Sequence, residues 1–205
     1  RNFRPKASIR PGAEVRAVAG HLRNPRLVGL VATAFIAMGV FVSMYNFFGF
    51  RAINDFGLAP SLAGLTYVMY LSGTWSSARA GSFVSRFGRG RVVLAAAVLM
   101  LTGALIGSSG NLIVTLVGLL IFTASFFALH STASGWVGLI AEKDRAEASS
   151  LYVFCYYMGS SLLGAATGQA FEALPWAGFV AVLAAMLGAL IAIAVALAVA
   201  EKRSE

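Results

Sequence analysis

Residues 81–91, GSFVSRFGRGR, lie between two long apolar segments and consist mostly of glycine, serine and arginine. Arginines at this density are stable only in water or among lipid headgroups, because a charged side chain is costly in hydrocarbon. The stretch is therefore predicted to be a loop at the membrane face that collects cations. The other segments of the chain can be oriented from it.

The composition is that of an integral membrane protein. Hydrophobic residues make up 59% of the 205 residues and charged residues only 12%, whereas charged residues are about a quarter of an ordinary soluble domain. A net charge of +8 would suit nucleic acid in a soluble chain. Here the cations lie between apolar segments, so we assign them to the membrane surface and expect the lipid bilayer, and no nucleic acid, as a partner.

Six apolar segments are long enough to cross a bilayer, which takes roughly 20 residues per helix. Helices are predicted rather than barrel strands, because the apolar runs are long and do not alternate with polar residues. The six predicted spans are residues 27–50, 61–84, 92–109, 112–141, 151–171 and 176–200. The fold class is thus an all-α integral membrane protein with six transmembrane helices.

The domain prediction follows from these spans. Residues 27–200 form the six-helix transmembrane bundle, and residues 201–205 form a cytoplasmic tail. Residues 1–26 form a cytoplasmic linker, in which residues 13–26 are either an amphipathic helix on the membrane surface or part of an unstructured basic tail.

The cations give the orientation. With six spans, fifteen of the sixteen Lys and Arg residues fall on one side, counting Arg79 at the end of its span, and only Arg51 falls on the other. By the positive-inside rule both termini are expected to be cytoplasmic. The sequence starts without Met, and we expect it to be a piece of a longer protein.

Small residues at helical spacing are candidates for close helix packing, because membrane helices associate where small side chains let their backbones approach. The candidates lie in the third, fifth and sixth predicted spans: Gly103, Gly107, Ser160, Gly164, Gly168 and Gly188.

Polar side chains are concentrated in the first and fourth predicted spans, whereas the third and sixth are almost wholly aliphatic. This predicts two helices that face a cavity and two that face lipid, at corresponding positions of two three-helix units. The candidates for lining a substrate cavity are Tyr45, Asn46, His130, Ser134 and Trp136. For each of them a helix-packing role, or for the aromatic residues a place at the membrane interface, is equally compatible with the sequence.

His130 is the one residue with an ionisable side chain deep within a predicted span, so it is also the candidate for proton coupling. A neutral histidine hydrogen-bonded between helices is the alternative. No combination of residues indicates a catalytic site, a metal site or a cofactor, so no enzymatic activity is expected.

Residues 81–91 also resemble the signature between the second and third helices of each half of major facilitator superfamily transporters. Four residues match its glycines and basic positions: Gly81, Arg86, Gly88 and Arg89. Ser85 stands where the signature has aspartate, and Gly90, followed by Arg91, stands at its last basic position. The stretches HSTASGWVG from His130 and SSLYVFCYYMGSSLLG from Ser149 are similar to bacterial drug and metabolite exporters.

The resemblance implies the C-terminal six-helix half of a proton-coupled exporter in the inner membrane of a bacterium. It would move small molecules by alternating access and would need an N-terminal six-helix half. Residues 81–91 would form its gating loop, with Gly81, Arg86, Gly88, Arg89 and Arg91 as the functional positions. A self-contained six-helix membrane protein with a binding or assembly role, without transport, is the alternative.

Overall fold

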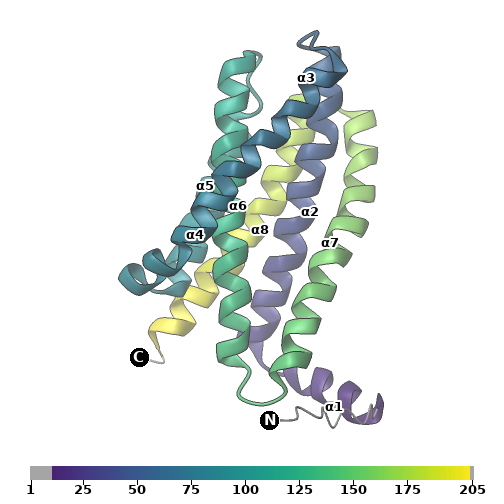
Figure 1. Ribbon diagram of the computed structural model, residues 1–205. Helices are drawn as coiled ribbons and strands as arrows, with labels where there is room; N and C mark the ends of the chain where they lie inside the picture. The colour runs from purple at the N-terminus through teal and green to yellow at the C-terminus, as the bar shows by residue number, and fades with distance from the viewer. Residues whose placement is uncertain (1–10, 204–205) are drawn as a thin grey trace, which may run out of the picture.

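The computed structural model describes residues 11–203, and the predictions for residues 1–10 and 204–205 lie outside these described residues. The described chain folds into eight α-helices and one short 3₁₀ helix, η1 (Figure 1). The helices are α1 (Pro11–His21), α2 (Pro25–Asn54), α3 (Pro60–Gly64), η1 (Leu65–Met69), α4 (Tyr70–Phe87), α5 (Arg89–Ile106), α6 (Leu112–Ile140), α7 (Arg145–Ala173) and α8 (Trp176–Lys202).

Two of the long helices begin at an asparagine that caps them. The Asn24 side chain accepts hydrogen bonds from the backbone N–H groups of Arg26 and Leu27, and Pro25 occupies the first turn of α2. The Asn111 side chain does the same for the start of α6. Such caps satisfy N–H groups that a helix end otherwise leaves without a partner, and so fix where each helix starts.

Of the described helices, α2, α5, α6 and α8 are long and apolar enough to cross a membrane. Six spans are predicted from the sequence, and the second and fifth correspond to α4 and α7. These two helices carry more serine and tyrosine, which lowers their hydropathy. In each predicted three-helix unit, therefore, the first and third helices are clear candidates for spans and the second is more polar.

The prediction that residues 81–91 form a loop is wrong. Helix α4 continues to Phe87 and α5 starts at Arg89, so Gly88 alone makes the turn between them. Gly88 has φ +84° and ψ 158°, a conformation open almost only to glycine. The arginines before it lie on the last turns of α4, where they are exposed, so their charge did not require a loop.

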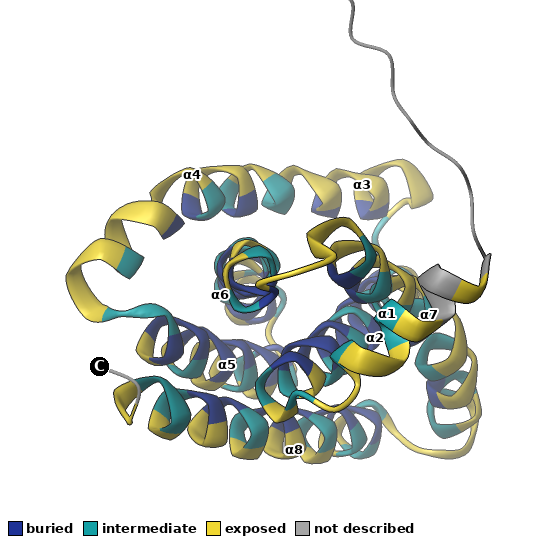
Figure 2. Ribbon diagram, turned by 90° about the horizontal axis from the view of Figure 1, so that it is seen from below, coloured by how far each residue is buried: buried dark blue, intermediate teal, exposed yellow. Residues whose placement is uncertain are grey.

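The long helices pack in a two-fold pattern. Helix α2 packs along α7 and α8, while α6 packs along α4 and α5, and α5 lies against α8. If α2, α4 and α5 are matched with α6, α7 and α8, each of these contacts maps onto another or onto itself. Figure 2 shows α6 end-on with α4 and α5 on opposite sides of it. Each half of the pattern therefore buries its apolar surface mainly against the other half.

Glycines mark the closest approaches between helices. A Cβ at Gly103 of α5 would lie 2.5 Å from the Phe122 backbone nitrogen of α6, and one at Gly118 would lie equally close to the Gly107 nitrogen. Helices α2 and α7 meet in the same way, through Gly39 and Gly159. At these points the backbones themselves are in contact, which any side chain would prevent.

The other packing candidates have looser surroundings. On α7 the close contact falls at Gly159, while the neighbouring Ser160 donates a hydrogen bond to the Tyr157 carbonyl of its own helix. Cβ atoms at Gly164 and Gly168 would meet side chains of α2 at ordinary distances of 3.8 and 3.5 Å. A Cβ at Gly188 would meet no atom within 4 Å.

Candidate functional site

A continuous series of aromatic ring contacts crosses the bundle from η1 and α4, through α2 and α6, to α7. We call it the ring chain. Its members in order are Tyr67, Tyr70, Tyr45, Phe41, Phe126, His130, Tyr156 and Tyr157. The two ends are accessible, with Tyr67 53% and Tyr157 63% exposed, whereas Phe41 and Phe126 in the middle are buried. Its surface offers aromatic faces together with hydroxyl and imidazole groups.

His130 lies between α6 and α7 and is half-buried. Its Nδ1 atom is 3.1 Å from the Tyr152 hydroxyl. The centre of its imidazole ring is 4.7 Å from the centre of the Tyr156 ring, and the imidazole stacks against the Phe126 ring. An imidazole nitrogen can donate or accept a proton in such a hydrogen bond, so the pair can hold either tautomer.

Tyr45 and Asn46 lie on α2, beside α3 and η1. The Tyr45 hydroxyl is 2.6 Å from the Thr123 hydroxyl of α6 and is buried, while Asn46 is exposed. Both line a groove of about 500 Å³ whose other wall includes Tyr67. Tyr45 therefore links this groove to the ring chain, and Asn46 offers an amide at its surface.

Ser134 and Trp136 do not join the ring chain contacts. Ser134 lies one helical turn beyond His130, is half-buried, and donates a hydrogen bond to the Ser131 carbonyl of its own helix. Trp136 is 6% exposed and belongs to the hydrophobic core. Among the sequence candidates, Tyr45 and His130 are thus linked through the rings of Phe41 and Phe126, and Asn46 lies beside Tyr45.

Some of the polar groups predicted to face a cavity instead join helices. The Ser43 hydroxyl of α2 is 2.6 Å from the Thr167 hydroxyl of α7, and it donates to the Gly39 carbonyl. Thr123 is fully buried against Tyr45. Polar groups in an apolar setting need a hydrogen-bond partner, and here they find it between helices.

Sequence reasoning missed most of the ring chain. On α7, Tyr156 of the ring chain shares one face with Tyr152, the hydrogen-bond partner of His130, because they are four residues apart. Tyr67 and Tyr70 are three residues apart. This spacing indicates that the rings lie on one helix face, but aromatic residues at helix ends are also typical of the membrane interface.

The turn at Gly88 is held by a carboxylate that the sequence did not single out. The two Glu201 side-chain oxygens of α8 accept hydrogen bonds from the backbone N–H groups of Arg89 at 3.1 Å and Gly90 at 2.6 Å. A carboxylate at a helix N-terminus is favoured by the helix dipole and by the unpaired N–H groups. Ser85 stands where the signature has aspartate. Its hydroxyl donates a hydrogen bond to the Ser82 carbonyl of its own helix.

Arg51 binds the backbone carbonyls at the C-terminal end of α5. Its guanidinium donates to the Gly107 carbonyl at 2.8 Å and to the Ser109 carbonyl at 2.6 Å, and it is 6% exposed. It lies 4.7 Å from the Trp176 ring of α8, and the Trp176 indole N–H donates to the same Gly107 carbonyl at 3.1 Å. Arg51 therefore caps the C-terminal end of α5.

Comparison with known proteins places the chain among transporters. No family model matches it. It is 38% identical over 188 residues to the inner membrane transport protein YnfM of Escherichia coli, covering 91% of this chain and 45% of that protein. It is 31% identical over 188 residues to the uncharacterized MFS-type transporter YybF of Bacillus subtilis, covering 91% and 46%. An uncharacterized transporter of Buchnera aphidicola is 37% identical over 159 residues, which are 77% of this chain and 38% of that protein.

The chain thus spans less than half the length of these curated relatives, between 38% and 46%. All three are named as transporters and none as an enzyme. The similarity extends over most of the chain and agrees with its apolar helices and with the signature around Gly88. The chain belongs to the major facilitator superfamily of membrane transporters.

Proposed function

We propose that this chain is a six-helix half of a secondary transporter that exports small molecules in exchange for protons. It would work by alternating access between two six-helix halves, of which the N-terminal one is missing from this chain. The observation that carries the proposal is the ring chain, which joins accessible tyrosines on both sides of the bundle to His130 between them. The relatives, which are more than twice as long as the part that they share with this chain, support the need for a second half.

In this proposal α4 and α7 supply the second and fifth crossings. Helix α7 has 29 residues, which at 1.5 Å per residue reach about 43 Å, more than the hydrocarbon thickness of a bilayer. Helix α4 is shorter, but α3 and η1 extend it without a break back to Pro60. Their exposed apolar residues, such as Trp75 and Phe154, would contact lipid or the other half.

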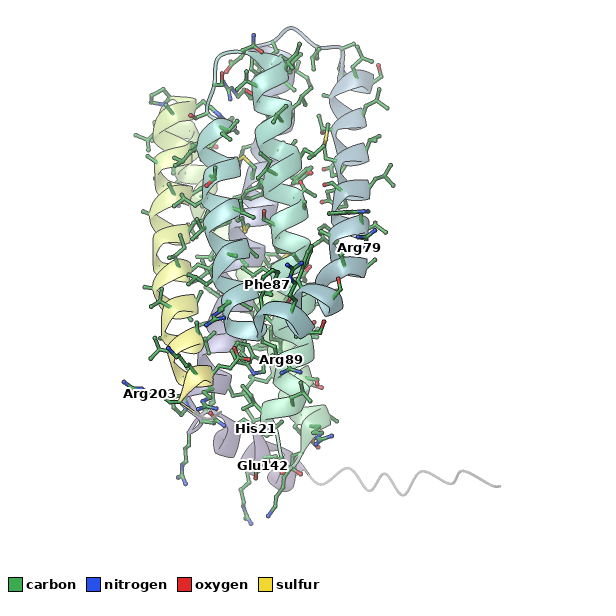
Figure 3. The ribbon with its side chains drawn as sticks, turned by 90° about the vertical axis from the view of Figure 1, so that its left-hand side faces the viewer. His21, Arg79, Phe87, Arg89, Glu142 and Arg203 are labelled. Carbon is green, nitrogen blue, oxygen red and sulfur yellow. The ribbon has the colours of Figure 1, made fainter. Side chains whose placement is uncertain are left out.

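The orientation proposed is that both termini face the cytoplasm. Arg89, Arg203, His21 and Glu142 all lie at one end of the bundle (Figure 3), and α3 lies at the other (Figure 1). Loops rich in Lys and Arg stay on the cytoplasmic side. A relative named as an inner membrane protein supports the inner membrane as the location.

Gating is proposed for the helix ends around Gly88. In this view the turn at Gly88 and the neighbouring helix ends form the gate, with Glu201 in the place of the missing aspartate. The residues involved are Gly81 and Arg86 on α4, Gly88 at the turn, and Arg89 and Arg91 on α5. The contact between Glu201 and the start of α5 would be kept in one state of the transport cycle and altered in another.

Transport by the two halves is the first test. The chain and its upstream region, expressed together or alone, would be reconstituted in vesicles, and pH-driven movement of a fluorescent amphiphilic dye would be measured. Movement is expected only when both parts are present. Transport by this chain alone would refute the proposal that it is one half.

Proton coupling by His130 is the second test. His130→Ala is expected to abolish dye movement driven by a pH gradient, because no other His, Lys, Arg, Asp or Glu lies deep within the predicted spans. His21→Ala is the matched control, since His21 lies on α1 and contacts the Asp144 carbonyl at the end of the bundle. Unchanged pH dependence in a folded His130→Ala protein would leave His130 with a packing role.

A further inference from the structure

An apolar groove of about 520 Å³ opens between α4 and α5 and has α6 as its floor. It starts at the Gly88 end, where Phe87 and Arg91 form its mouth, and it extends to Trp75 and Leu99. From Arg91 to Leu99 this is about 12 Å along α5, at 1.5 Å per residue. Figure 3 shows Phe87 at the foot of α4 close to α5, with Arg79 higher on α4.

The groove offers almost nothing to a polar ligand along its length. Its floor is small and apolar, with Ala124 and Ala128. The two serines that line it are already bonded: the Ser76 hydroxyl donates to the Ala124 carbonyl at 2.7 Å, and the Ser125 hydroxyl donates to the Ile121 carbonyl at 2.7 Å. An occupant must therefore be apolar over this length, as a hydrocarbon chain is.

The mouth of the groove is cationic. Arg91 lines it and is exposed, and Arg86 lies beside it, with its guanidinium 5.1 Å from the Phe87 ring. A long apolar groove with arginines at the membrane-surface end matches a molecule that has an apolar tail and an anionic head.

We infer that the groove between α4 and α5 holds one acyl chain of an anionic phospholipid, with its phosphate beside Arg91. The tail would lie along Ala95 and Leu99, over the floor of α6, and the headgroup would lie at the Gly88 turn. A guanidinium can donate two parallel hydrogen bonds to phosphate oxygens, which favours this headgroup over an uncharged one. The inference does not rest on transport, and it applies to this chain whether or not it moves a substrate.

Trp75 provides the measurement, because it lines the groove. The chain would be placed in phosphatidylcholine vesicles, and phosphatidylglycerol or phosphatidylcholine with brominated acyl chains would be titrated in. Bromine quenches tryptophan on contact, and Trp75→Phe protein would give the signal of Trp136 and Trp176 to be subtracted. We expect brominated phosphatidylglycerol to reach Trp75 with roughly fivefold preference, the effect of one cation at an anionic membrane surface.

Two pairs of variants separate headgroup from tail. Arg91→Gln is expected to remove most of the preference for phosphatidylglycerol, whereas Arg203→Gln, a cation at the same end outside the groove, is expected to keep it. Ala95→Leu is expected to reduce quenching of Trp75 by both lipids, because the larger side chain fills the groove. Val98→Leu enlarges an exposed residue of α5 that does not line the groove and is expected to change nothing.

Equal quenching by the two lipids, unaffected by Arg91→Gln, would overturn the inference in favour of unselective lipid contact. Absence of Trp75 quenching by either lipid would overturn it as well, and would mean that protein covers the groove. Loss of quenching on Ala95→Leu together with an Arg91-dependent preference would support it.

Discussion

The two ends of α5 are held by charges of opposite sign that come from different helices. At its start, Glu201 of α8 accepts hydrogen bonds from two backbone N–H groups; at its end, Arg51 of α2 donates to the carbonyls of Gly107 and Ser109. Both charges complement the helix dipole.

The two ends differ in burial. Arg51 is 6% exposed and also contacts Trp176 and Phe56, whereas Glu201 is half-buried in a groove that it shares with exposed arginines. A hydrogen bond to a charged group is costlier to lose where the group is buried than where water can replace the partner. The comparison indicates that the Arg51 end is the costlier of the two ends to open.

Arg51→Ala should give the largest effect. It removes two hydrogen bonds from a charged donor, one to the Gly107 carbonyl and one to the Ser109 carbonyl, each of which keeps one other donor. The loss should destabilise the chain by about 3 kcal/mol. The measurement is the unfolded fraction in a denaturing-detergent titration. Arg203→Ala, at an exposed position, is the control. A loss equal to that of the control would contradict the asymmetry between the two ends.

Gly103→Ala tests whether helix packing also strengthens the Arg51 end. The new Cβ would fall 2.5 Å from the α6 backbone, so α5 and α6 must separate, at about 2 kcal/mol. Gly188→Ala adds the same methyl where no atom lies within 4 Å and should be neutral or slightly stabilising. The same detergent titration compares the two, and equal effects would count against the tight crossing.

Gly88→Ala examines the turn at the Glu201 end. Alanine at φ +84° and ψ 158° should cost about 2 kcal/mol through backbone strain. Gly81→Ala lies in the same stretch but inside α4, with open space around it, and should be stabilising by up to about 1 kcal/mol. Thermal unfolding in mild detergent would distinguish them, and destabilisation by Gly81→Ala would argue for the loop predicted from the sequence.

Glu201→Gln should give the smallest loss, about 1 kcal/mol, because the amide oxygen still accepts one N–H while the charge at the start of α5 is lost. Glu172→Gln removes an exposed carboxylate near the end of α7 and should have no measurable effect. A loss for Glu201→Gln as large as that for Arg51→Ala would remove the difference between the two ends.

Hydrophobic runs were sufficient to locate the helices, because burial in lipid and helix formation impose the same long apolar segments. They could not locate the turn between α4 and α5. Exposed arginines are compatible with a helix as well as with a loop, and a turn made by Gly88 alone leaves no polar interval in the sequence.

The site was predictable only in part, for a different reason. His130 is conspicuous because it is an ionisable residue in an apolar run, and the sequence shows that directly. Its partner Tyr152 lies on the next helix, and a contact between helices depends on how they rotate against each other. The same holds for Glu201, whose bonds to Arg89 and Gly90 span more than a hundred residues.

The connection between α4 and α5 is a single residue, so it cannot lengthen or shorten when the helices move. Because Gly88 alone joins α4 to α5, a tilt of α4 cannot be absorbed by intervening chain and must pivot on the Gly88 backbone. The far end of α4 then sweeps through the widest arc, while the foot of the helix hardly moves. Such a pivot would turn a small rearrangement around Glu201 into a large displacement near Tyr70, at the other end of α4.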